Sequence, residues 1–231
     1  MKTHLLLLLF VGLLFSACKT ENIDGKLFII GGGYVNASMR DKMIEETGVD
    51  KEGYIVVLPM SSEEEPLENI QETVDIFKDT PEVKIFGFNI QKGDLISGAR
   101  IDSIRNAKIV FISGGDQSRF LDVIEGTPIK QAIFDAYNNG SLIAGTSAGA
   151  SVMSEVMVTG NEHNYPDDSG NFETIEARNV ETIQGLGLIK SVTIDQHFII
   201  RKRMNRMISY SIENPRHLCV GIDEATAIYV E

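Results

Sequence analysis

Cysteine is scarce in this sequence, which has two among its 231 residues, Cys18 and Cys219. Cys18 ends an N-terminal stretch with a basic start, a leucine-rich core and small residues before the cysteine, as in the signal peptide and lipobox of a bacterial lipoprotein. The alternative is an ordinary signal peptide cut near Ala17. Lipid attachment would leave Cys219, which we expect to be buried, as the only thiol, so this interpretation excludes an intrachain disulfide.

Positive charge is also in short supply. Lysine and arginine number 21 against 33 aspartates and glutamates, which gives a net charge of −12. An acidic surface of this kind argues against nucleic acid, or an anionic membrane surface, as the main partner. The N-terminal apolar run is short for a membrane span. We therefore expect an exported bacterial protein, periplasmic or on the cell surface, that meets the membrane only through a lipid anchor on Cys18.

The usual signatures of nucleotide and metal sites are missing. Three glycines follow the first apolar run, but Asn36 stands where the last glycine of a G-x-G-x-x-G loop belongs. The second strand ends in Pro59-Met60 instead of an acidic residue. The sequence has neither a P-loop lysine nor a cluster with metal-ligand spacing. We therefore expect no cofactor and no metal ion.

Short apolar runs alternate with helical patterns along the rest of the chain. After a signal peptide (1–18) and a polar tether (19–25), we expect a single domain over 26–231. Its strands are expected at Leu27–Ile30, Tyr54–Leu58, 83–88, Lys108–Ile112 and Ser141–Gly145. Continuous apolar runs indicate strands covered on both faces, so the fold class is α/β, a three-layer sandwich with a mostly parallel sheet. In such sheets, sites lie at the carboxyl ends of the strands.

Helix signals fall between these strands. Helices are expected at about 36–47, 65–77 and 117–124, and from Thr127-Pro128, an N-cap followed by proline, to the closing Gly140. Residues 159–182 are polar and rich in turn formers, which indicates a surface excursion.

A candidate nucleophile follows the strand at 141–145. The sequence Gly145-Thr146-Ser147-Ala148-Gly149 matches the nucleophile elbow, in which glycines permit a tight strand-to-helix turn with the serine hydroxyl exposed at its apex. Backbone N–H groups around such a turn can hold an oxyanion, and we assign this role to Gly115 and Ala148. The alternative is that Ser147 is only a turn residue.

Histidines are few, and beyond the signal peptide there are three. His163 lies in the polar excursion, and His217 lies in a connection that we expect at the surface. His197 follows a strand, where other loops should converge, so it is the best candidate for a general base. The alternative is a core histidine that caps the strand.

Charged side chains surround this candidate base in the sequence. Three arginines follow His197 and could recognise a carboxylate or form a solvated face: Arg201, Arg203 and Arg206. Three carboxylates could orient the imidazole or bind a substrate cation: Glu162, Asp195 and Glu224. The residues alone leave these alternatives open.

Four motifs in order, FISGGDQ, GTSAGAS, DQHF followed by R-x-R-x-x-R, and GIDEATA, resemble cyanophycinases in the peptidase E-like family of serine peptidases. The resemblance implies a flavodoxin-like sandwich related to class I glutamine amidotransferases. It also implies that Ser147 is the nucleophile, that His197 is its base, and that Glu162, with Glu224 as the alternative, is the acid. The implied substrate-binding positions are Gln117, Asp195, Gln196, Arg201, Arg203, Arg206 and Glu224, with Asp195 and Glu224 facing a guanidinium group.

The resemblance also implies an activity. Enzymes of this type hydrolyse cyanophycin, multi-L-arginyl-poly-L-aspartate, to β-Asp-Arg dipeptides without a cofactor, and dimers are expected. The alternatives are a peptidase E-like dipeptidase or isopeptidase for other aspartate-containing peptides, and a non-catalytic lipoprotein that binds acidic peptides. Family members usually continue beyond GIDEATA with further strands, so we expect that the sequence ending at Glu231 is shortened at its C-terminus.

Overall fold

The computed structural model describes residues 25–168 and 172–231. The expected signal peptide, Cys18 and all of the tether except Gly25 lie outside the described residues. No helix within those two ranges is long and apolar enough to cross a membrane.

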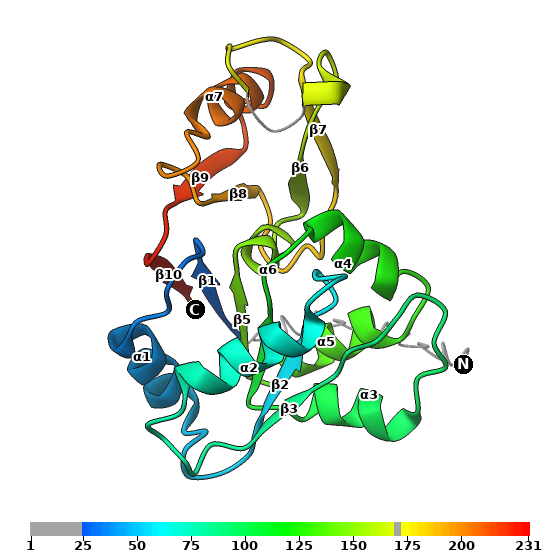
Figure 1. Ribbon diagram of the computed structural model, residues 1–231, viewed down its shortest axis with the longest axis vertical. Helices are drawn as coiled ribbons and strands as arrows, with labels where there is room; N and C mark the ends of the chain where they lie inside the picture. The colour runs from blue at the N-terminus through cyan, green and yellow to red at the C-terminus, as the bar shows by residue number, and fades with distance from the viewer. Residues whose placement is uncertain (1–24, 169–171) are drawn as a thin grey trace, which may run out of the picture.

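A six-stranded sheet forms the centre of the molecule (Figure 1). Its order is β10-β1-β5-β4-β2-β3, and every neighbouring pair is parallel except β1 with β10. The strands are β1 (Lys26–Ile30), β2 (Ile55–Leu58), β3 (Ile85–Gly87), β4 (Ile109–Ile112), β5 (Leu142–Thr146) and β10 (Ala227–Val230).

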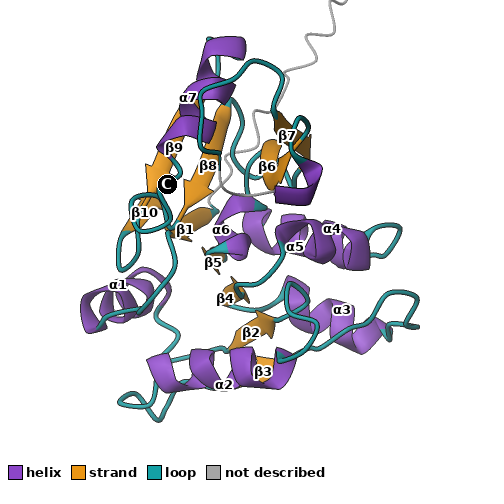
Figure 2. Cartoon of the chain, turned by 45° about the horizontal axis from the view of Figure 1, so that its top comes forward, coloured by secondary structure: helices purple, strands orange, loops and turns teal. Residues whose placement is uncertain are grey.

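Helices cover both faces of this sheet (Figure 2). They are α1 (Ala37–Thr47), α2 (Pro66–Ile76), α3 (Gly98–Arg105), α4 (Gln117–Ile124), α5 (Ile129–Asn138) and the short α6 (Ala148–Ser151). Alternate residues of a strand belong to opposite cores: Val56 packs with α3, α4 and α5, whereas Ile55 packs with α1 and α2. The expected three-layer α/β sandwich with a mostly parallel sheet is confirmed.

Several helices begin and end at the residues that their sequences predict. The Asn36 side chain accepts a hydrogen bond from the Met39 N–H at 3.1 Å, and Gly48 closes α1 with a φ of 62°. Asp116 caps α4 by accepting from the Ser118 N–H at 2.7 Å. This cap fixes the start of α4 beside the end of β4, at the edge of the sheet where a site is expected.

The remaining elements lie together at one end of the molecule (Figure 1). An antiparallel pair is formed by β6 (Val156–Glu162) and β7 (Val180–Gln184), with the 3-10 helix η1 (Pro166–Asp168) between them. A parallel pair is formed by β8 (Val192–Gln196) and β9 (Leu218–Ile222), joined through α7 (Met204–Glu213). The expected excursion at 159–182 therefore begins inside β6 and ends inside β7. Cys219, in β9, is half-buried, where we expected a buried thiol.

Candidate active site

Ser147 occupies a strained turn between β5 and α6. Its backbone has a φ of 54° and a ψ of −115°, a region that residues with side chains rarely adopt. Its N–H donates to the Ile30 carbonyl at 3.1 Å. A Cβ at Gly145 would overlap the Gly149 backbone, and one at Gly149 would overlap the Ile112 carbonyl. Both glycines of the elbow pattern are therefore needed for the close packing that holds the serine at the apex.

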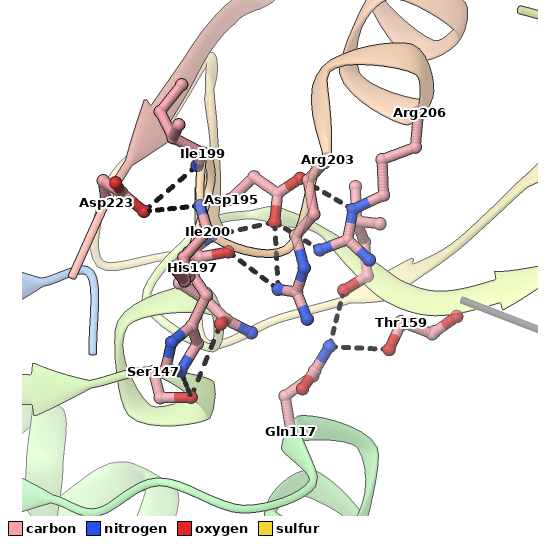
Figure 3. Close-up of polar contacts among 12 residues, drawn as sticks. Gln117, Ser147, Thr159, Asp195, His197, Ile199, Ile200, Arg203, Arg206 and Asp223 are labelled. Carbon is pink, nitrogen blue, oxygen red and sulfur yellow. Dashed lines mark hydrogen bonds and ion pairs between the residues drawn. The ribbon is translucent and has the colours of Figure 1, made fainter. Parts of the chain in front are cut away.

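His197 and Glu224 complete a chain of hydrogen bonds with this serine. The Ser147 Oγ lies 2.8 Å from Nε2 of His197 (Figure 3), and the His197 Nδ1 lies 2.6 Å from Oε1 of Glu224. An ionised carboxylate can only accept, so Nδ1 carries the proton and Nε2 is left to accept from the serine hydroxyl. This tautomer is the one that a general base requires.

The three glycines after β1 pack against His197 and Glu224. The His197 N–H donates to the Gly31 carbonyl at 2.7 Å. Gly32 has a φ of 109°, and a Cβ there would overlap the imidazole ring. A Cβ at Gly33 would lie 2.9 Å from Cβ of Glu224. Sequence reasoning missed this role, because the glycine run was considered only as a candidate dinucleotide loop.

The site favours the neutral form of His197. The side chain is buried, and this burial lowers the pKa of the imidazole below its usual value of 6.5. The Glu224 hydrogen bond raises the pKa, and the positive charges of Arg201 and Arg203 lower it. A histidine that is neutral at neutral pH can accept a proton from serine.

The carboxylate beside His197 is Glu224, which corrects the expectation of Glu162. Glu162 is buried at the end of β6, where it accepts from the Phe172 N–H and from the Asn179 amide, each at 2.7 Å. The β6–β7 hairpin carries it away from the histidine. Glu224 instead lies in the turn between β9 and β10, and the pairing of β10 with β1 brings that turn to Gly33.

Of the two N–H groups predicted for an oxyanion, that of Ala148 follows Ser147 in the chain, and that of Gly115 follows Gly114, which packs against the serine. Ala148 follows Ser147 and begins α6, while the Gly114-Gly115 turn after β4 passes the serine, with a Cβ at Gly114 placed 3.3 Å from that of Ser147. Within the described ranges, the N–H groups of Gly115 and Ala148 donate to no other group. Both are therefore available to a bound oxygen.

Arg203 and Arg206 form a network with the buried Asp195 (Figure 3). The Asp195 carboxylate is saturated by Arg206, whose Nε donates to it at 2.7 Å, and it is approached by Arg203 at 3.4 Å. Arg203 also donates to the Gln196 carbonyl at 2.8 Å. The expectation that Asp195 faces a substrate guanidinium is therefore wrong, because the carboxylate is only 1 % exposed and already bound by the protein's own arginines.

This network keeps a surplus of positive charge near the catalytic candidates. Two guanidinium groups share one carboxylate, and burial with the nearby charge of Arg206 lowers the pKa of Arg203 to about 10. Phe172, which sequence reasoning missed, lies under the Arg206 guanidinium at 5.6 Å. Arg201 is exposed. Arg201, Arg203 and Arg206 together form an electropositive wall beside His197.

Of the two glutamines, Gln196 contacts the serine, whereas Gln117 binds the backbone of β6. Gln117 is buried at the start of α4 and donates to the Val158 and Thr159 carbonyls of β6 at 3.1 and 2.6 Å (Figure 3). The Gln196 Oε1 lies 3.4 Å from the Ser147 Oγ, a longer contact than the one to His197. His163 is exposed, and His217 contacts the Tyr210 hydroxyl, so neither reaches the serine.

Comparison with known proteins places these residues in a family context. The model of peptidase family S51 matches residues 27–231. A cyanophycinase of Nostoc sp. is 34% identical over 180 residues, covering 77% of this chain and 57% of that protein. A cyanophycinase of Geminocystis herdmanii is 36% identical over 124 residues, covering 53% of this chain and 43% of that protein. The chain thus spans about half the length of the curated relatives it matches.

A solved structure supports the fold. The crystal structure of a peptidase from an acI-B1 actinobacterium superposes with a TM-score of 0.66 at 21% sequence identity, covering 90% of this chain and 83% of that chain. At this level of identity, the likeness bears on the fold alone.

Proposed function

Since this chain belongs to peptidase family S51, we propose that it is a serine peptidase that hydrolyses cyanophycin and releases β-Asp-Arg dipeptides. One observation carries the proposal: the continuous contacts from Ser147 through His197 to Glu224, at 2.8 and 2.6 Å. A non-catalytic peptide-binding protein would have no use for this arrangement. The cyanophycinase relatives support the choice of substrate.

The reaction follows from the roles of these side chains. Ser147 attacks the peptide carbonyl while Nε2 of His197 takes its proton, and Glu224 stabilises the imidazolium through Nδ1. The Gly115 and Ala148 N–H groups hold the oxyanion. His197 returns the proton to the departing amine, the C–N bond breaks, and an acyl-enzyme is left. Water activated by the same histidine then releases the acid and restores the serine.

The electropositive wall suits the product. Each arginine of the polymer carries a free α-carboxylate, and Arg201 and Arg203 are placed to attract it beside His197. Arg206 and Asp195 act behind them by holding Arg203 and the Gln196 backbone in place. A dipeptidase or isopeptidase for other aspartate-containing peptides is the alternative within the same chemistry.

The test is product release from purified cyanophycin, followed by mass spectrometry. The wild-type protein should release β-Asp-Arg, and Ser147→Ala should release none. Glu68→Gln, an exposed carboxylate of α2, serves as a control that should retain activity. A folded protein that reacts with a fluorophosphonate at Ser147 but releases no dipeptide would contradict cyanophycin as the substrate. The assignment as a serine hydrolase would stand.

We also propose export and lipid attachment at Cys18, on the strength of the N-terminal sequence. Cells that express the full chain and grow with radiolabelled palmitate should yield a labelled protein in the membrane fraction. Cys18→Ser should abolish the label. Equal labelling of both proteins would contradict the proposal.

A further inference from the structure

A cavity of about 560 Å³ opens at Ser147 on the side of the sheet covered by α1 and α2. It is bounded by Ser113, Gly114 and Ser147 at one end and by residues of α1 and α2 at the other. None of Arg201, Arg203 and Arg206 lines it. Its volume lies in the range of about 300–1,000 Å³ found for small-molecule sites. The nucleophile therefore has an electropositive wall on one side and a separate, differently lined cavity on the other.

Tyr34 stands at the mouth of this cavity with little to cover it. It follows the glycines that hold His197, lines the cavity, and is 76 % exposed. A large aromatic side chain that stays exposed beside a nucleophile presents its ring face to an incoming group. Such a face attracts a guanidinium or ammonium ion, and a guanidinium can also stack on it.

The charges in the cavity wall point to the same class of ligand. Arg40 is already bound to Asp79 at 3.2 Å and to Asp41, so its charge is compensated. Glu72 and Asp75 of α2 add two carboxylates, against one further cation, Lys78. Within the described residues Glu72 forms no ion pair, which leaves its carboxylate free to accept from a cation.

We propose that this cavity is the subsite for a guanidinium side chain of the substrate, with Tyr34 stacked on the guanidinium and Glu72 accepting from it. The inference rests on the proposed function, because it assigns a substrate-binding role to the cavity beside the proposed nucleophile. Arginyl groups of the polymer carry both a carboxylate and a guanidinium. The two sides of Ser147 then recognise different groups of the substrate. The arginines bind a carboxylate, and Tyr34 binds a guanidinium.

Binding to the Ser147→Ala protein tests this assignment without any turnover. Calorimetry would compare a segment of three β-Asp-Arg units with the same segment carrying citrulline, the neutral isostere of arginine. The arginyl segment should bind about tenfold more tightly, which corresponds to one desolvated cation–π contact with a carboxylate partner. Adding Tyr34→Ala or Glu72→Gln should reduce this preference to about twofold, whereas Tyr34→Phe should keep it.

Matched controls separate the subsite from general effects. Tyr165 is an exposed tyrosine outside the cavity, and Glu68 lies one turn from Glu72 on α2 without lining it. Tyr165→Ala and Glu68→Gln should leave the preference unchanged. Tyr34 and Glu72 are exposed, so their variants should unfold at the same temperature as the parent protein.

Equal binding of the two segments, or a full preference in Tyr34→Ala, would overturn the subsite. Release of β-Asp-Arg from cyanophycin by the wild-type protein decides the proposed function separately. Dipeptide release with no preference for arginine would remove the subsite and keep the peptidase. A preference that depends on Tyr34, in a protein that releases no dipeptide, would support the subsite and remove the proposed reaction.

Discussion

His197 experiences opposing influences on its pKa, and their balance makes the activity depend on pH. Burial, the largest influence, keeps the imidazole pKa below 6.5, while the Glu224 hydrogen bond raises it. Because the neutral form is the base, kcat/KM should rise with pH through this pKa and level off by neutral pH. In Glu224→Gln the rise should move to lower pH and kcat should fall by about 10²–10⁴-fold, since the imidazolium loses its carboxylate.

Profiles of kcat/KM against pH for the two proteins would check this prediction. Glu52→Gln, which removes an exposed carboxylate paired with Lys108, is the control and should reproduce the wild-type profile. An unchanged profile in Glu224→Gln would separate Glu224 from the function of the histidine.

Glu162 should behave in the opposite way. It accepts from two N–H donors in a buried position, so Glu162→Gln would turn an amide N–H toward one of them. We expect a loss of about 1–3 kcal/mol in the free energy of unfolding, with the pH profile of kcat/KM unchanged. Urea unfolding and the same kinetic profiles would measure both. Normal stability with a lost pH dependence would return Glu162 to the catalytic site.

At the level of single residues, the sequence predicted which side chains belong to the site better than it predicted which side chains they contact. Ser147 and His197 both follow strands, and the ends of strands are where sites were expected, so both were named as candidates. Their proximity spans two sheets, because β5 belongs to the six-stranded sheet and β8 to the pair with β9. The choice between Glu162 and Glu224 could not be foreseen, because it depends on where β6 and β10 lie relative to His197. The saturation of Asp195 by Arg206 is likewise a matter of distance, which no spacing encodes.

Among the connecting elements, the turn after β1 should be sensitive to change, because it packs against the candidate base. Gly32→Ala would place a side chain against the His197 ring at a φ of 109°, where only glycine is unstrained. We expect kcat to fall about 10²-fold, because a displacement of the base by about 1 Å has this effect. Gly98→Ala, at the open start of α3, should be neutral. Kinetics and melting of both variants test the prediction, and an active Gly32→Ala protein would contradict it.

The strands differed in how well their sequence patterns predicted their bounds. Buried strands such as β2 and β4 were placed within about one residue, since continuous β-branched and apolar runs require cover on both faces. The run at 83–88 contributes only Ile85–Gly87, because an edge strand pairs on one side and its neighbours turn away. Strands β6 and β7 contain Thr, Asn, Glu and Gln, so their polarity predicted an excursion where the chain forms a hairpin.

Across the whole molecule, the site joins residues from both ends of the described chain. The glycines after β1 hold His197, and Glu224 precedes β10, which pairs with β1 in the antiparallel sense. The apolar run at Leu27–Ile30 predicted β1, but no strand was predicted at 227–230, so this closure was not foreseen. The position of the acid therefore depends on how firmly β10 is held at the edge of the sheet.

A cluster around Glu46 of α1 holds that edge. Glu46 binds Lys26 of β1 at 2.5 Å, Lys42 at 2.6 Å and the Tyr229 hydroxyl of β10 at 2.6 Å. The Lys26 hydrogen bond, followed by those of Lys42 and Tyr229, lowers the pKa of Glu46 to about 2. A lowered carboxyl pKa stabilises the fold above its unfolded value, near 4.5, and this contribution is lost as the pH falls toward 2.

Glu46→Gln should therefore lower the free energy of unfolding at pH 7 by up to about 1 kcal/mol, and the difference from wild type should shrink at pH 3. Urea unfolding at the two pH values measures this. Glu52→Gln removes one exposed pair with Lys108 far from β10 and should have a smaller effect. If Glu46 acts through β10, its substitution should also reduce kcat at pH 7, because Glu224 loses its anchor, while Glu52→Gln should not. Reduced stability with an unaltered kcat would show that the position of the acid is set by the β9–β10 turn alone.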